Sequence, residues 1–141
     1  MKTRLREDLN IARRERDKLR TTVLTTLLSD IRNREIELGH EAGDEDVLAL
    51  LGTAIKRRRE AAEQMRSGGR EELAAKEDQE ATLLQVYLPP QLDEAEVREM
   101  VRAAVAAGAT DMGAVMKAVM PRVKGKFEGR ELSRIAKEEL A

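Results

Sequence analysis

Apolar side chains recur every three or four positions between residues 19 and 31, and this spacing constrains the fold more than any other feature. The members of the stripe are Leu19, Val23, Leu24, Leu27, Leu28 and Ile31. An α-helix places all of them on one face because 3.6 residues complete a turn, whereas a strand would divide them between its two faces. Similar spacing continues along most of the 141 residues, and aromatic residues make up only 1% of the chain. The sequence therefore predicts an all-α fold.

Capping residues and glycines divide this pattern into separate helices. Asp17 is positioned to cap a second helix that ends near Gly39, where glycine readily adopts the left-handed conformation. A third helix is expected after Asp44, with an acidic first turn that suits the helix dipole, and it should fade by Ser67-Gly68-Gly69. A fourth is expected over residues 71–87, and its apolar markers are Leu73, Leu84 and Tyr87.

The prolines after Leu88 mark a predicted domain boundary. Pro89 and Pro90 cannot continue a helix and restrict the residue before them. We therefore predict two domains, residues 1–88 and residues 89–141. The first is expected to be an antiparallel helical bundle because its connecting loops are short, and the second a small three-helix domain with little core of its own.

The predicted C-terminal domain carries clear helix signals. Asp93 and Glu96 are spaced as a capping box. A stripe over residues 112–120 alternates methionine with valine at helical spacing and is expected to end at Pro121. We interpret its methionines as core packing, since this flexible side chain fills irregular gaps, while a methionine-lined binding groove stays open as an alternative.

Composition excludes several classes of function. The chain has no cysteine, so it forms no disulfide and no thiolate metal site. Its one histidine, His40, has no partner at helical spacing and is interpreted as a solvated loop residue. No phosphate-binding glycine motif or nucleophile elbow is present. We expect no cofactor, no metal and no catalytic residues, and a soluble, cytoplasmic protein that does not contact membranes, since no signal peptide or long apolar run is seen.

Charge is distributed in blocks although the net charge is only −1. The densest basic run is Lys56, Arg57, Arg58 and Arg59. Four consecutive cations point to all sides of a helix, and two interpretations remain open. They can pair with the acidic fourth helix, or they can form a patch that faces RNA.

A second basic segment spans residues 122–130. It places Arg122, Lys124, Lys126 and Arg130 around Gly125 and Gly129. Glycines allow backbone N–H groups to approach a phosphate and the cations supply the charge. Such a loop would bind a nucleic-acid backbone without reading bases, although a solvated basic turn is also consistent with these residues.

Several stretches together resemble one known family. They are Ile55-Lys56-Arg57-Arg58-Arg59-Glu60, Gly69-Arg70-Glu71-Glu72-Leu73 with Lys76-Glu77, Tyr87-Leu88-Pro89, Asp111-Met112-Gly113 with Val115-Met116, and Pro121 with Lys124-Gly125 and Gly129. Over nearly its whole length the chain resembles the YqeY-like proteins of the GatB/YqeY family.

The resemblance implies an N-terminal helical bundle and a smaller C-terminal domain. The latter is similar to the tail domain of the B subunit of the tRNA-dependent amidotransferase, which amidates Glu-tRNA(Gln) or Asp-tRNA(Asn) with glutamine as nitrogen donor. In that subunit the tail helps to grip tRNA, and nothing in this sequence matches the catalytic, metal or glutaminase parts. The positions implied for tRNA contact are Lys117, Arg122, Lys124, Gly125, Lys126 and Arg130. Phe127 departs from the polar residue expected in this loop, either as a stacking platform or as a packing residue.

We therefore expect a non-catalytic tRNA-binding accessory module, associated through its family with a carbon–nitrogen ligase that uses glutamine as amido donor. The alternative is a protein-interaction adaptor that docks on an amidotransferase subunit or an aminoacyl-tRNA synthetase through faces that include residues 56–70. A third hypothesis, an enzyme component acting on carbon–nitrogen bonds, has no catalytic motif to support it.

Overall fold

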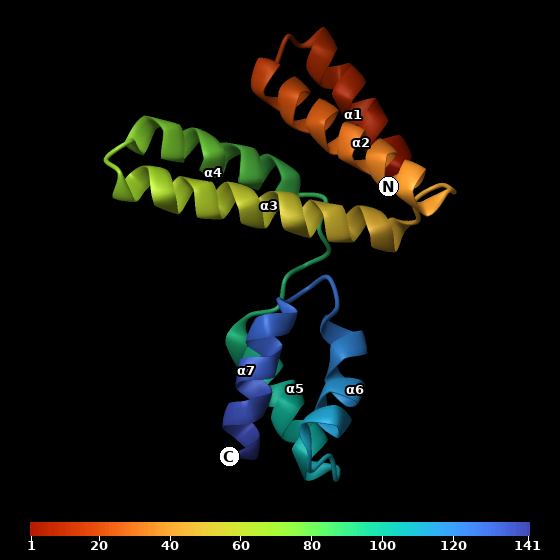
Figure 1. Cartoon of the computed structure of the whole chain (residues 1–141), viewed down its shortest axis with the longest axis vertical. Coiled ribbons are helices and arrows are strands. Elements are labelled where there is room, and N and C mark those ends of the chain that lie inside the picture. The colour runs from red at the N-terminus through yellow and green to blue at the C-terminus, as the bar shows by residue number, and fades with distance from the viewer. The chain divides into compact units, whose positions relative to one another are not determined.

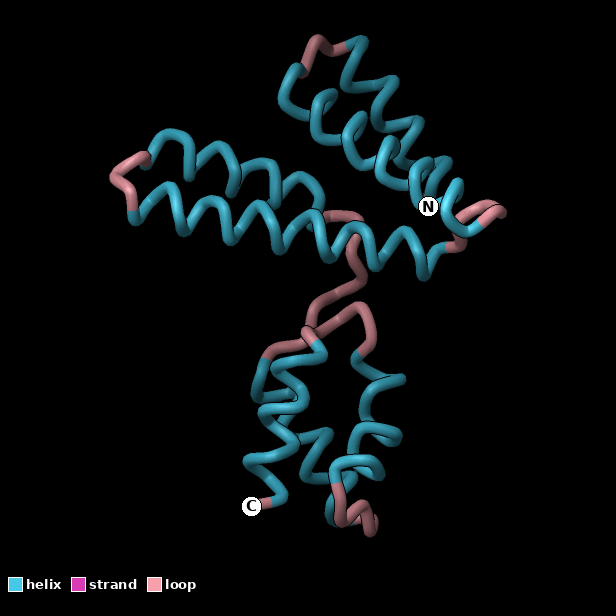
Figure 2. Tube along the Cα trace, in the orientation of Figure 1, coloured by secondary structure: helices cyan, strands magenta, loops and turns pink.

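The computed structural model describes all 141 residues and consists of seven α-helices joined by loops, with no β-strand (Figures 1 and 2). The helices are α1 (Lys2–Arg14), α2 (Lys18–Leu38), α3 (Asp44–Ser67), α4 (Glu71–Gln85), α5 (Glu94–Ala106), α6 (Met112–Val123) and α7 (Gly129–Leu140). The predicted all-α fold class is therefore confirmed.

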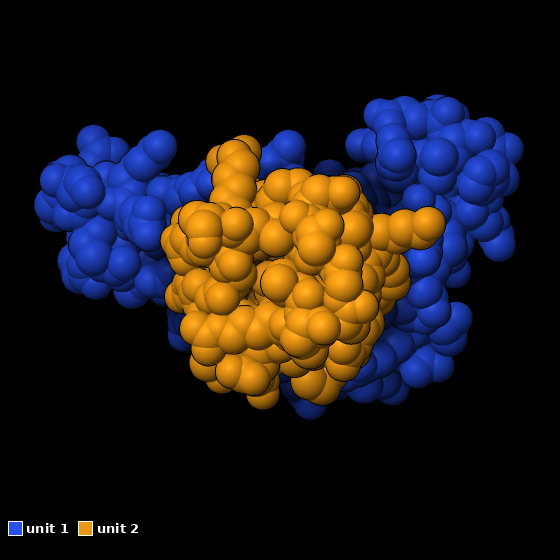
Figure 3. All heavy atoms as spheres, turned by 90° about the horizontal axis from the view of Figure 1, so that it is seen from below, with its two compact units in different colours: residues 1–88 blue, residues 89–141 orange.

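The chain divides into two compact units, coloured separately in Figure 3. The N-terminal unit is Met1–Leu88 and the C-terminal unit is Pro89–Ala141. Each has its own apolar core. Whether each unit folds independently stays a prediction.

Figure 1 shows that the N-terminal unit consists of an α1–α2 hairpin and an α3–α4 hairpin, and buried side chains of both hairpins form one core. Leu5 of α1, Leu27 of α2, Leu51 of α3 and Leu84 of α4 are each no more than 2% exposed. Every helix of this unit thus contributes its apolar stripe to the same interior, as the predicted helical bundle requires.

The predicted ends of α2 are confirmed. The backbone N–H of Arg20 donates to Oδ1 of Asp17 at 3.1 Å, so Asp17 caps the helix. At the other end Gly39 adopts φ 75° and its N–H donates to the carbonyl oxygen of Glu35 at 2.9 Å. A left-handed backbone of this kind costs glycine little, because glycine has no Cβ.

Two details of the predicted fourth helix are wrong. The helix ends at Gln85 rather than at residue 87, and Leu73 is 46% exposed. Besides Leu51 and Leu84, the buried residues of α3 and α4 include several alanines, of which Ala62, Ala74 and Ala81 are all 1% exposed or less. Small side chains let the two helices approach closely, and this leaves Leu73 outside the contact.

Tyr87 anchors the end of α4 to the first hairpin. The residue is only 4% exposed, its hydroxyl donates to Oδ2 of Asp8, and the guanidinium of Arg4 lies 4.8 Å from the ring centroid. Arg20 of α2 approaches the same Asp8 carboxylate at 3.8 Å. Burial, and then the neighbouring Asp8, raises the pKa of the Tyr87 phenol. The phenol is therefore a protonated donor at neutral pH, consistent with its bond to Asp8.

The C-terminal unit packs α5, α6 and α7 around a small aliphatic core. Its fully buried members include Val97, Val101, Val115, Leu132 and Ile135. The methionines of the α6 stripe are partly buried against this core, so the interpretation of core packing is confirmed. The capping box of α5 is also confirmed, with Glu96 N–H donating to Asp93 Oδ1 at 2.8 Å and Asp93 N–H donating to Glu96 Oε2 at 3.0 Å.

The expectation that Pro121 ends the sixth helix is wrong, because α6 continues to Val123. Proline removes only one backbone donor, and here it lies in the last turn. The turn is retained because Val123 is fully buried and Lys124 N–H donates to the carbonyl oxygen of Met120 at 3.0 Å. Arg122 consequently projects from a helix rather than from a loop.

Candidate nucleic-acid interface

The turn between α6 and α7 is held in one conformation by backbone and side-chain bonds. Gly125 adopts φ 77°, and the N–H groups of Lys126 and Phe127 donate to the carbonyl oxygen of Val123 at 2.8 and 3.0 Å. On the other side, Leu92 N–H donates to the carbonyl oxygen of Lys126 at 2.9 Å, and Gln91 Nε2 donates to that of Gly125 at 3.1 Å. The backbone of the basic segment is therefore a hydrogen-bonded turn and not an extended loop.

We call the cations of this region, with Lys117 of α6, the basic turn. Its members are Lys117, Arg122, Lys124, Lys126 and Arg130. All are exposed except Lys126, which is half-buried. Lys117, Arg122, Lys126 and Arg130 form no salt bridge or side-chain hydrogen bond, while Lys124 has an interaction partner. Four positive charges are thus left for a ligand.

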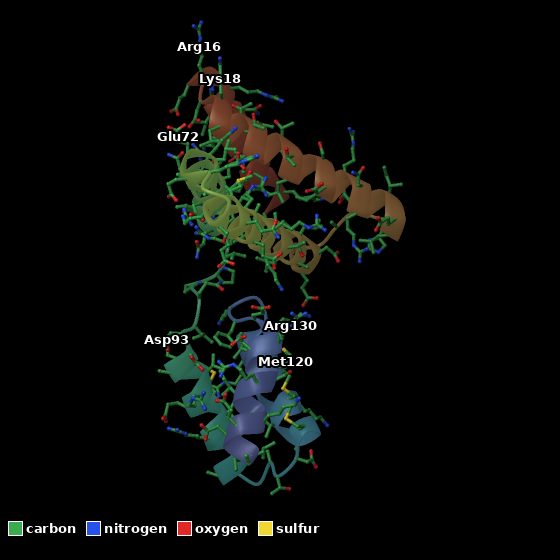
Figure 4. All side chains as sticks on the ribbon, turned by 60° about the vertical axis from the view of Figure 1, so that its left-hand side comes forward. Arg16, Lys18, Glu72, Asp93, Met120 and Arg130 are labelled. Carbon is green, nitrogen blue, oxygen red and sulfur yellow. The ribbon has the colours of Figure 1, made fainter.

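The start of α7 offers backbone N–H groups beside the basic turn, and it also carries two carboxylates, those of the N-cap residue Glu128 and of Glu131 in the first turn. Its N-cap residue, Glu128, makes no side-chain hydrogen bond to the helix, so the first N–H groups are not capped from within. Arg130 lies in the same first turn, as Figure 4 shows. The N-terminal end of a helix carries partial positive charge, which favours an anion beside it.

Phe127 is half-buried and packs against the core of the C-terminal unit. Of its two interpretations, this supports local packing. A ring that packs against the core is poorly placed to stack on a base, so a nucleic acid bound here would be contacted through its phosphates and sugars.

The other arginines of the C-terminal unit are occupied by an ion network between α5 and α7. Arg98 bonds to Glu138 at 2.7 Å and to Glu139 at 2.8 Å. Arg134 bonds to Glu94 at 2.6 Å and to Glu138 at 2.7 Å. Arg102 joins the same network through Glu139 at 3.1 Å. The unpaired cations are therefore concentrated at the basic turn, apart from the exposed Lys137.

This network predicts acid-sensitive glutamates. Arg134, followed by Arg98, lowers the pKa of Glu94 below its ordinary 4.5, and Arg98, followed by Arg134, does the same for Glu138. A lowered pKa in the folded state adds stability above pH 4.5 that is lost as pH falls through the lowered value. We expect side-chain NMR titration to place both midpoints below 4.5, and Arg134→Gln to raise that of Glu94 more than that of Glu138. Unchanged midpoints in that variant would contradict the network.

The second predicted cluster, residues 56–59, lies in the N-terminal unit on α3. Arg58 Nε lies 3.3 Å from Glu80 Oε2, and Arg59 Nη1 lies 3.0 Å from Asp78 Oδ1. The pairing with the acidic fourth helix is therefore present for these two arginines. Lys56 also has an interaction partner, and Arg57 is exposed beside the groove between α2 and α3. RNA contact by this run stays a prediction, and the paired guanidiniums are less available for it than the basic turn.

His40 is an exposed turn residue whose Nδ1 lies 2.8 Å from the carbonyl oxygen of Glu41, as predicted for a solvated histidine. No group of three or more histidine and acidic side chains is arranged to hold a metal ion. None of the seven helices combines the length and apolar character needed to span a bilayer.

The comparison with known families bears directly on this architecture. A model described as "Yqey-like protein" matches residues 2–140, which is almost the entire chain with both units. The chain belongs to the Yqey-like protein family. The resemblance seen in the sequence motifs is therefore confirmed.

One curated relative is similar to this Yqey-like chain over part of its length. It is "Altered inheritance of mitochondria protein 41, mitochondrial" of the yeast Vanderwaltozyma polyspora, 35% identical over 85 residues. The match covers 60% of this chain and 46% of the yeast protein. The chain thus matches less than half of that relative's length, and the mitochondrial location in the relative's name refers to the yeast protein.

Sequence reasoning missed how the basic turn is held in place. Gln91 binds Gly125 from 34 positions away, and Leu92 pairs with Lys126 over a similar separation. No local pattern in the segment after Pro90 indicates this role, because the contact exists only after the C-terminal unit has folded. The uncapped start of α7 was detectable in principle, since Glu128 is not a favoured N-cap residue.

Proposed function

We propose that this Yqey-like chain is a tRNA-binding accessory module with no catalysis of its own. The observation that carries the proposal is the basic turn, where Arg122, Lys126 and Arg130 form no salt bridge around a fixed backbone turn, and Lys117, which also forms none, lies on α6. Preorganised cations of this kind suit a phosphate backbone and carry no base specificity. The resemblance to the tail domain of the amidotransferase B subunit is the reason for proposing tRNA as the ligand. The module would act in the cytoplasm or in another compartment that contains tRNA.

Four phosphate contacts predict modest affinity. Sequence-independent binding at physiological salt typically has a Kd of about 10⁻⁴ to 10⁻⁶ M. Such affinity suits a module that assists a tRNA-dependent amidotransferase or a synthetase, and is too weak to sequester tRNA.

The test is charge reversal of two unpaired members of the basic turn. We expect Arg122→Glu/Lys126→Glu to weaken binding of unfractionated tRNA by about tenfold or more at ~0.1 M salt, because two phosphate contacts become repulsions. The slope of log K against log salt should fall by about 1.5 to 2. Titration by fluorescence anisotropy at several salt concentrations measures both quantities.

The matched control is Arg70→Glu/Lys137→Glu, which makes the same charge change at two exposed cations outside the basic turn. It should leave the affinity and the salt slope close to those of the unmodified chain. Equal losses in both variants would mean that only net charge matters, and would contradict a binding role for the turn. Failure of the unmodified chain to bind tRNA at low salt would remove the proposal altogether.

A second candidate is the protein adaptor that docks on an amidotransferase subunit or a synthetase. It is favoured by two exposed aliphatic side chains of the N-terminal unit, Ile36 at 73% and Val86 at 62%. This candidate would be supported over tRNA binding if amidotransferase subunits still retained the chain after nuclease treatment and if Ile36→Asp abolished that retention.

A further inference from the structure

A groove in the N-terminal unit runs between α1 and α2 and has a volume of about 320 Å³. Three exposed arginines line it, Arg6 and Arg13 from α1 and Arg32 from α2. Thr25 and Ser29 add two exposed hydroxyl groups on the α2 side. We call this feature the α1–α2 groove. Its residues belong to neither basic segment that the sequence singled out.

Helical spacing explains why these side chains meet. Arg6 and Arg13 are seven residues apart, so they lie on one face of α1 two turns from each other. Thr25, Ser29 and Arg32 follow at i, i+4 and i+7 on α2 and share a face in the same way. The apolar stripes of both helices turn into the core, and the polar faces beside them form the two rims.

The charge of the groove is positive and is not neutralised from within. Arg6, Arg13 and Arg32 form no salt bridge. The carboxylate that lines the groove, Glu35, is engaged by Lys2 Nζ at 2.7 Å and by the N–H of Ala42 at 2.8 Å. Those bonds lower the pKa of Glu35, and Arg6 adds a smaller attraction. Even with Glu35 ionised, the lining arginines outnumber it three to one.

The arginines of the other hairpin show the contrast. Arg58, Arg59 and Arg66 each contact a carboxylate of α4 at 2.8 to 3.3 Å. These cations are used to hold α3 against α4. The α1–α2 hairpin presents no such acidic face to its own groove, so its guanidiniums remain available to an outside ligand.

We propose that the α1–α2 groove is a second RNA-binding surface, which takes the phosphate backbone between Arg6, Arg13 and Arg32. Guanidinium forks pair bidentately with phosphate oxygens, and the hydroxyls of Thr25 and Ser29 are neutral donors of the kind that complete such contacts. Arg6 and Arg13 are roughly 10 Å apart along α1. That span is about three times the ~3.4 Å axial rise per nucleotide of a DNA strand, so the two guanidiniums can pair with different phosphates of one backbone. No aromatic residue lines the groove, so binding there is independent of sequence.

This surface deepens the proposed function and rests on it for the identity of the ligand. Two weak sites in one chain bind a single tRNA more tightly than either alone, because the second contact is intramolecular. The groove would therefore supply affinity that the basic turn lacks.

The experiment compares four forms of the full chain for binding of unfractionated tRNA between about 50 and 200 mM salt. They are the unmodified chain, the groove variant Arg6→Glu/Arg32→Glu, the turn variant Arg122→Glu/Lys126→Glu, and the control Arg70→Glu/Lys76→Glu. The control reverses two exposed cations of the same unit outside the groove. We expect the groove variant to bind about tenfold or more weakly, with a salt slope lower by about 1.5 to 2. The control should stay within about twofold.

If the groove variant bound tRNA like the control, with an unchanged salt slope, the inference would be overturned. If the turn variant bound tRNA more weakly in the same experiment, the proposed function would still hold. The reverse pattern would support the groove and reject the basic turn. Absence of tRNA binding in the unmodified chain would reject both. If the unmodified chain bound polyglutamate as tightly as tRNA, and the groove variant lost that binding, the groove would be a surface for acidic peptides. That result would also overturn the proposal that it binds RNA phosphates. If the groove variant unfolds, Arg6→Gln/Arg32→Gln should show the same fall in slope without introducing new negative charge.

Discussion

Replacing Ile135 by alanine is expected to unfold the C-terminal unit while the N-terminal unit stays folded. Ile135 is fully buried in the core formed by α5, α6 and α7. Truncation of a buried isoleucine to alanine costs about 2 to 5 kcal/mol. A unit of this size, Pro89–Ala141, has a total stability of only about 3 to 8 kcal/mol. The substitution therefore removes most of it.

The composition of the chain allows the two units to be followed separately. The one tyrosine, Tyr87, lies in the N-terminal unit, and there is no tryptophan. Tyrosine fluorescence therefore reports on the N-terminal unit, whereas far-UV circular dichroism reports on all seven helices. In Ile135→Ala the dichroism should show an early thermal transition, lowered by more than about 10 °C, that tyrosine fluorescence does not follow.

Ile36→Ala is the matched control, since it makes the same chemical change at a side chain that is 73% exposed. Its effect should be within about 0.5 kcal/mol. If tyrosine fluorescence and dichroism show the same transition temperature in Ile135→Ala, the two units unfold as one cooperative structure. The predicted domain boundary would then not separate two independently folding units.

Replacing Tyr87 by alanine is expected to destabilise the N-terminal unit by about 3 to 5 kcal/mol, because a buried aromatic ring is removed. The ring is also where α4 meets the first hairpin, through Asp8 of α1 and the cation–π contact of Arg4. Its loss leaves a cavity and an Asp8 carboxylate with fewer partners. Thermal unfolding by dichroism in the full chain measures the cost.

Tyr87→Phe separates packing from hydrogen bonding. It keeps the ring and removes the bond to Asp8, so we expect a smaller loss of about 1 to 3 kcal/mol. Arg20 remains at 3.8 Å from the carboxylate and limits the cost. A loss in Tyr87→Phe as large as in Tyr87→Ala would show that the hydrogen bond, and not the packed ring, holds α4 in place.

Helix boundaries were predictable because their signals are local. Asp17 and the Asp93–Glu96 pair bond to backbone groups three residues away, and Gly39 ends its helix through its own backbone conformation. The apolar stripe of α2 needs only the helical repeat to identify the buried face. These features depend on residues close together in the sequence, so a single chain reveals them.

Packing between helices was less predictable. Leu73 was one of the apolar markers of the fourth helix, yet it is exposed, and Ala74 and Ala81 of the same helix are buried. An apolar periodicity predicts that the most hydrophobic side chains are buried. The distance between α3 and α4 depends instead on which small residues face each other. Pro121 likewise stays within α6 because the burial of Val123 outweighs one missing hydrogen bond.

The sequence by itself determined that this protein is helical, where most of its helices begin and end, and to which family it belongs. The helical character and the helix ends follow from hydrogen bonding and side-chain spacing within about one or two turns. The family follows from motifs spread along the chain and from the match over residues 2–140. Only the tertiary structure decided which cations remain available to a ligand. Arg58 and Arg59 are neutralised by acids 22 and 19 positions away, whereas Arg122, Lys126 and the arginines of the α1–α2 groove meet no such partner. A salt bridge depends on distance in space, and that distance exists only once the helices have packed.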